Sequence, residues 1–214
     1  MRRGGRATSL EIEIKLRIDD IAEILRRLRR IGARSRGRVF ERNMLYDTPG
    51  GSFWRAGCLL RIRTETPAPT HLLAGGLRRA VLTFKAPPPL GRSQGKAASR
   101  RSKYKERAER EIEIRRPGIW PRRLRSLGLR PTFRYEKFRT SFRLESLHLD
   151  LDETPAGTFL ELEGAPREID RAARALGFGP RDYIQGTYWN IYAADCRRRG
   201  SVPKNMVFKG QKAG

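Results

Sequence analysis

Three ionic residues, Glu11, Glu13 and Lys15, alternate with Ile12 and Ile14 near the start of the sequence. In a β-strand every second side chain shares one face, so the ionic residues face one way and the aliphatic residues the other. Carboxylates bind hard metal ions through oxygen, and ammonium groups bind phosphate oxygens. The pattern therefore predicts a strand that presents both kinds of group on one face.

The same alternation recurs in at least six further segments. They are residues 60–63, 82–85, 107–114, 137–139, 147–152 and 160–163. A sheet with a solvated outer face explains any one of these strands. A closed barrel with a charged interior explains the whole set better, because about eight strands enclose room for one small ligand. Cations and carboxylates together indicate a metal–polyphosphate complex as that ligand.

Seven motifs in this order resemble those of the CYTH superfamily, the triphosphate tunnel metalloenzymes. The Glu11-x-Glu13-x-Lys15 run is similar to the family signature. The other similar segments are residues 43–49, 60–63, 82–85, 107–111, 136–139 and 151–163. The sequence departs from the family at Leu45, where an aromatic residue is frequent, and at residues 182–184, where Ser-Tyr is common. The resemblance covers about residues 9–196.

Strand segments separated by helical segments predict an α+β fold. The resemblance implies a closed antiparallel β-barrel of about eight strands, a triphosphate tunnel, with helices packed outside. Helices are predicted from a cap at Asp19 or Asp20 to Gly32, near 121–127, after Pro166, and over about 182–195. Loops are predicted at 65–79 and 86–105. The domain is expected at 9–196, with disordered basic ends at 1–8 and 197–214, and the tail is expected to be dispensable for turnover.

The resemblance implies a metal-dependent enzyme with a divided ionic site. The metal set, for one or two Mg²⁺ or Mn²⁺ ions, is Glu11, Glu13, Glu109, Glu111, Asp152, Glu161 and Glu163. The cations implied to grip the phosphates are Lys15, Lys85 and Arg107, taken as catalytic, with Arg61, Arg63, Lys137 and Arg139, taken as substrate-binding. Asp150 competes with Asp152 for the metal role, although the spacing to Gly157 favours Asp152.

Two reactions share such a site. A class IV adenylyl cyclase converts ATP to cyclic AMP and pyrophosphate, and a triphosphatase hydrolyses inorganic or thiamine triphosphate. The similarity of residues 46–49 and 157–163 looks closest to cyclase-like members, and the subtype stays open. The alternative is a non-catalytic module that binds polyphosphate or RNA, against which the carboxylates argue.

The composition is strongly basic, with 47 Lys and Arg against 23 Asp and Glu and a net charge of +24 over 214 residues. Such a surface attracts polyanions in general, so nonspecific binding and steering of an anionic substrate are expected. No nucleic-acid-binding motif accompanies the charge. Trp54, Trp120 and Trp189 are predicted to serve packing, and the chain is expected to be a monomer or a homodimer.

Two cysteines, Cys58 and Cys196, are too few for a disulfide framework and indicate a reducing, cytoplasmic location. Neither His71 nor His148 has a metal-ligand spacing with cysteine, and His148 is expected at the surface or the barrel rim. The N-terminal residues lack the apolar run of a signal peptide, and no stretch is long and apolar enough to predict a membrane span.

Overall fold

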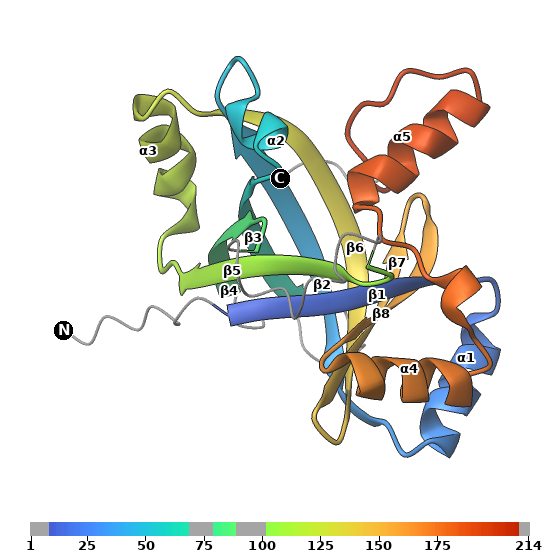
Figure 1. Ribbon diagram of the computed structural model, residues 1–214. Helices are drawn as coiled ribbons and strands as arrows, with labels where there is room; N and C mark the ends of the chain where they lie inside the picture. The colour runs from blue at the N-terminus through green and yellow to red at the C-terminus, as the bar shows by residue number, and fades with distance from the viewer. Residues whose placement is uncertain (1–8, 69–78, 89–101, 210–214) are drawn as a thin grey trace.

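A closed antiparallel barrel dominates the computed structural model, which describes residues 9–68, 79–88 and 102–209 (Figure 1). Within these residues eight strands close in the order β1-β5-β4-β3-β2-β6-β7-β8. Their bounds are β1 (Ser9–Ile18), β2 (Arg34–Asp47), β3 (Leu59–Pro67), β4 (Arg79–Ala86), β5 (Lys105–Glu113), β6 (Arg130–Leu144), β7 (Leu147–Thr154) and β8 (Gly157–Glu163). The predicted α+β fold with an eight-stranded barrel is confirmed.

The alternation in β1 sets which side chains point into the barrel. Ile14 and Leu16 are fully buried in a hydrophobic cluster on the outer face of the sheet. Glu13 and Lys15 line the interior cavity together with Glu11. The period-2 pattern in the sequence therefore corresponds to an apolar outside and an ionic inside.

Two helices cover the outer face of β1, β7 and β8. They are α1 (Ile21–Arg30) and α4 (Pro166–Ala175), which lie side by side at the lower right of Figure 1. Asp20 caps α1 by accepting a hydrogen bond from the Glu23 amide at 2.9 Å. Leu28 of α1 and Ile169 of α4 are fully buried in the same cluster as Leu16, so the helices hold this barrel wall through apolar packing.

Three further helices lie around the other end of the barrel (Figure 1). They are α2 (Ser52–Arg55), α3 (Trp120–Ser126) and α5 (Tyr188–Arg198). The sequence predicted the last helix from about residue 182, but α5 begins at Tyr188. Thr187 caps it by accepting a hydrogen bond from the Asn190 amide, while Ile184 forms an antiparallel bridge with Lys15. The residues before Thr187 are therefore occupied by pairing with β1.

Part of the predicted disordered tail is packed against the barrel. Met206 is fully buried and forms a parallel bridge with Tyr135 of β6. The boundary predicted at residue 197 therefore fails for residues 197–209, because an apolar contact and backbone hydrogen bonds hold them. Residues 1–8 and 210–214 and most of the two predicted loops lie outside the described residues. None of the described helices is long and apolar enough to cross a membrane.

Candidate active site

A cavity of about 1000 Å³ lies inside the barrel. Thirteen of the fourteen ionic residues predicted for the site line it; these are Glu11, Glu13, Lys15, Arg61, Arg63, Lys85, Arg107, Glu109, Glu111, Lys137, Arg139, Glu161 and Glu163. The fourteenth, Asp152, is fully buried and does not line the cavity. The barrel therefore brings predicted side chains from six of its strands together around one cavity.

Carboxylates gather on one side of the cavity around Lys85. The Lys85 ammonium group lies 2.6 Å from both oxygens of Glu11 and 3.2 Å from Glu109. Glu163 has no side-chain hydrogen bond or ion pair with another described residue. Burial and then the charge of Glu11 raise the pKa of Glu163 to about 7. This corner therefore holds more negative charge than Lys85 alone compensates.

The donor chemistry of Glu11, Glu109 and Glu163 fits Mg²⁺ or Mn²⁺, which prefer carboxylate oxygens. An added cation would relieve the repulsion that raises the pKa of Glu163. In the described part of the chain no three His, Cys, Asp or Glu side chains already stand in a metal-binding group. The corner is therefore a set of matching ligands and not a preassembled cage.

A second group of ion pairs surrounds Lys15. Its ammonium nitrogen lies 2.9 Å from both Glu13 and Glu161, and Glu13 is also paired with Lys105 at 2.5 Å. Burial opposes ionisation of Glu13, but Lys15 and Lys105 outweigh it and lower the pKa of Glu13 to about 2. Glu13 is therefore ionised across the physiological range.

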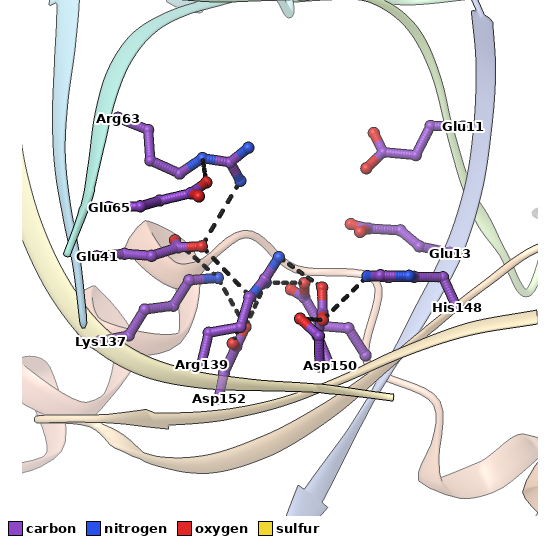
Figure 2. Close-up of polar contacts among 12 residues, drawn as sticks. Glu11, Glu13, Glu41, Arg63, Glu65, Lys137, Arg139, His148, Asp150 and Asp152 are labelled. Atoms are coloured by element: carbon purple, nitrogen blue, oxygen red, sulfur yellow. Dashed lines mark hydrogen bonds and ion pairs between the residues drawn. The ribbon is translucent and has the colours of Figure 1, made fainter. Parts of the chain in front are cut away.

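Lys137 and Arg139 form the opposite wall with the residues of β7 (Figure 2). Arg139 contacts Asp150, Asp152 and Glu161, each at 2.6 Å. Asp152 also accepts hydrogen bonds from Lys137 at 2.7 Å and from the Tyr188 hydroxyl at 2.6 Å. Because these donors occupy its oxygens and Asp152 is fully buried, its carboxylate orients cations. Its neighbour on the same face, Asp150, lines the cavity.

Two arginines of β3 add to the cationic lining. Arg61 donates hydrogen bonds to the Tyr135 hydroxyl at 3.1 Å and to Thr83 at 3.3 Å. Its Nε atom is buried and has no hydrogen-bond partner among the described residues. Arg63 lies 3.4 Å from Glu111. Arg61 thus lines the cavity with a guanidinium group, which suits phosphate oxygens.

Arg107 lies toward the helix α2 end of the cavity. Its NH1 group donates a hydrogen bond to the Gly57 carbonyl oxygen, so this predicted catalytic residue also holds the chain segment that follows α2.

The sequence interpretation missed or misplaced several residues of the site. Lys105 was assigned to a loop, but it is the first residue of β5 and pairs with Glu13. It is in phase with Arg107 and Glu109, so extending that alternation by one step would have identified it. Glu41, which is 1% exposed, is likewise in phase with Asn43 of the second motif. His148, expected at the surface or the barrel rim, has a side chain that is 38% exposed, lines the cavity and lies 3.0 Å from Asp150.

Aromatic side chains line the end of the cavity between α2 and α5. They are Phe53, Trp54, Phe133, Tyr188 and Trp189. Phe133 and Trp189 are in edge contact, with ring centroids 4.8 Å apart, and Trp54 is 58% exposed. The prediction that the tryptophans serve packing therefore holds for Trp120, which packs in a hydrophobic cluster, and is incomplete for Trp54 and Trp189.

This chain aligns with nearly the whole length of several solved structures that share its fold. A "putative adenylate cyclase" from Vibrio parahaemolyticus has a TM-score of 0.68 at 18% identity, covering 86% of this chain and 98% of that one. The PH1819 protein from Pyrococcus horikoshii has a TM-score of 0.65 at 23% identity, covering 86% and 99%. HpAC1 from Hippeastrum, named for a dominant triphosphatase activity, has a TM-score of 0.54 at 19% identity, covering 90% and 97%. At these identities the likeness establishes the fold.

No curated protein sequence matches this chain significantly. The family model of the CYTH domain matches residues 9–188, which span all eight described strands and the start of α5. The match and the barrel with its ionic lining agree, and the chain belongs to the CYTH domain family.

Proposed function

We propose that this protein is a metal-dependent enzyme that acts on a triphosphate inside the barrel. The observation that carries the proposal is the pairing of cations and carboxylates around one cavity of about 1000 Å³ inside the barrel. A site for anions alone has no need of the carboxylate corner at Glu11, Glu109 and Glu163. A site for metal ions alone has no need of the cations that line the cavity, such as Arg61, Lys137 and Arg139. A metal–polyphosphate complex uses both.

The geometry supports the following roles. We assign Mg²⁺ or Mn²⁺ to Glu11, Glu109 and Glu163, with Glu13, Glu111 and Glu161 completing the acidic lining. When bound, the metal would neutralise charge on phosphate oxygens. The phosphate contacts are assigned to Lys15, Arg61, Arg63, Lys85, Arg107, Lys137 and Arg139. Asp152 is assigned to holding Lys137 and Arg139 in place, because it does not reach the cavity.

The same lining supports two reactions. In a triphosphatase, water attacks the terminal phosphorus and the bond to the bridging oxygen breaks. In a cyclase, the ribose 3′-hydroxyl attacks the α-phosphorus and pyrophosphate leaves. The aromatic end of the cavity, with Trp54 and Trp189, supports a triphosphate that carries a flat organic group over bare tripolyphosphate.

The test is incubation of the purified protein with Mg²⁺ or Mn²⁺ and, separately, ATP, thiamine triphosphate and tripolyphosphate. Cyclic AMP with pyrophosphate would identify a cyclase, and orthophosphate would identify a triphosphatase. Binding of all three compounds without turnover would instead support the non-catalytic module. Absence of both binding and turnover would overturn the proposed function. The free thiols of Cys58 and Cys196 are consistent with the predicted cytoplasmic location.

A further inference from the structure

Glu41 is a buried carboxylate in the wall of the barrel that the assigned roles leave unused. It lies in β2, is 1% exposed and does not line the cavity. Figure 2 shows it across the barrel from Glu11 and Glu13, directed toward a group of cations. Burial of a charged group is costly, so Glu41 needs a compensating partner.

Three cations supply that compensation, and all three belong to the phosphate-binding lining. The Glu41 carboxylate lies 3.6 Å from Lys137, 3.6 Å from Arg139 and 3.7 Å from Arg63. Asn43 also donates a hydrogen bond to it at 3.3 Å. The cations outweigh the effect of burial and hold the pKa of Glu41 far below its usual value, so the carboxylate is charged.

The position of β2 explains why one carboxylate reaches all three. In the barrel β2 lies between β3, which carries Arg63, and β6, which carries Lys137 and Arg139. Asp152 contacts Lys137 and Arg139 from the β7 side. Among the ion pairs of the described residues, Glu41 is the carboxylate shared by Arg63 and both β6 cations.

We propose that Glu41 is a positioning residue that ties Arg63 to Lys137 and Arg139 and limits how tightly the cavity holds a polyanion. The turnover part of this inference rests on the proposed function, and the binding part does not. A bound triphosphate and the Glu41 carboxylate would compete for ion pairs with the same three cations. The carboxylate therefore keeps the cations in place in the empty cavity and weakens their hold on the bound anion.

The test variant is Glu41→Gln, which keeps the size of the side chain and removes its charge. We expect the Kd for tripolyphosphate, measured by calorimetry, to fall at least tenfold. For the substrate that is turned over, KM and kcat should both fall, because tighter binding slows product release. Loss of a merely structural contact would raise KM or leave it unchanged.

The matched control is Glu136→Gln. Glu136 is also 1% exposed and lies in the same wall, but it contacts Arg134 and Arg42 and does not line the cavity. This variant should lose thermal stability and keep its tripolyphosphate Kd within about twofold. Glu41→Asp, which retains the charge, should stay within about threefold of the wild type.

A second readout is independent of any enzyme activity. Sulfate should raise the melting temperature of Glu41→Gln more than that of the wild type, because an added anion replaces the missing carboxylate. If Glu41→Gln is unfolded in anion-free buffer, sulfate should restore its fold. Equal stabilisation of the two proteins by sulfate, failure to restore the fold, or an equal gain in affinity in Glu136→Gln would overturn the inference. A wild type that binds no triphosphate would overturn the proposed function, while the sulfate comparison would still decide the role of Glu41.

Discussion

At the residue scale, the carboxylates of the cavity differ in how well they are compensated. Glu13 has two lysines and a pKa of about 2, whereas Glu163 has no described ion-pair partner and a pKa of about 7. Burial acts against both charges, so the difference comes from the neighbours. The two residues therefore serve different ends: Glu13 organises lysines, and Glu163 keeps its oxygens available.

Removal of the Glu163 charge should separate activity from stability. In Glu163→Gln, metal-dependent turnover should fall at least 100-fold, since a metal ligand is lost. The free energy of unfolding at pH 8 should rise by roughly 1–3 kcal/mol, because a poorly compensated, partly buried charge is removed. Urea unfolding at pH 5 and pH 8 checks this, with exposed Glu145→Gln as the control. A destabilised variant with full turnover would contradict the assignment.

The pKa of Glu163 also predicts how metal affinity varies with pH. Its folded pKa is raised above that of the free side chain, so protonation stabilises the metal-free fold and competes with metal binding below pH 7. The affinity for Mg²⁺ should therefore increase by up to about tenfold per pH unit between pH 5 and 7 and level off above it. Calorimetry in two buffers of different ionisation enthalpy would detect the released proton. The same release from Glu163→Gln would exclude this residue as its source.

At the element scale, α5 and the segment after it act as one unit against the barrel. The Tyr188 ring at the start of α5 lies 5.0 Å from the Lys137 ammonium and 5.4 Å from that of Lys15. Tyr192 donates a hydrogen bond to the Asn205 carbonyl oxygen, and Met206 follows with its buried side chain. The segment expected to be dispensable therefore supports a helix that contacts two cations of the cavity.

Truncation of the Met206 side chain should measure this support. Met206→Ala should destabilise the protein by about 2–4 kcal/mol, because a fully buried side chain leaves a cavity. Val202→Ala, at a position that is 79% exposed, should change stability by less than about 0.5 kcal/mol. Equal effects of the two changes on the urea midpoint would show that residues 202–206 do not pack on the barrel in solution.

The strands could be predicted from sequence and this C-terminal packing could not, for a physical reason. Alternation is a local property, and in β1 it is unbroken from Leu10 to Arg17, so it identified both the strand and its ionic face. The bridge from Met206 to Tyr135 depends on residues far apart in the chain, and no local pattern marks it. The start of α5 was missed similarly, because the Ile184 pairing with Lys15 overrides helical spacing. Glu41 was missed because only Asn43 and the residues after it matched a motif.

At the scale of the whole molecule, the net charge of +24 and the ionic lining are separate features. Exposed arginines such as Arg29 and Arg30 of α1 contribute to the long-range field, which salt screens. Arg61 is 8% exposed and faces the cavity, where screening is weaker. The position of a cation and the total positive charge of the protein therefore predict different effects on turnover.

The comparison of Arg61→Ala with the double variant Arg29→Ala/Arg30→Ala tests them. Arg61→Ala should reduce turnover at least 1000-fold, since a charge-assisted phosphate contact is lost. The double variant removes twice the charge, yet turnover should stay within about twofold while nonspecific binding to a polyanion weakens and its salt dependence declines. Circular dichroism would confirm that each variant folds. The reverse ranking would indicate an electrostatic binding protein.

The strand near the start of the chain, β1, pairs with the last described strand, β8, to close the barrel. The carboxylate corner therefore forms only when this late pairing is made during folding. Glu13 pairs in register with Glu163, so the seam joins the start of the family domain to a strand near its end. Joining such distant segments costs loop-closure entropy, and non-local strand pairing of this kind is typical of slow folding. The carboxylate corner straddles this seam, since Glu11 stands on one side of it and Glu163 on the other. The carboxylate corner proposed to bind a metal ion is therefore incomplete until β8 has been synthesised and has paired with β1.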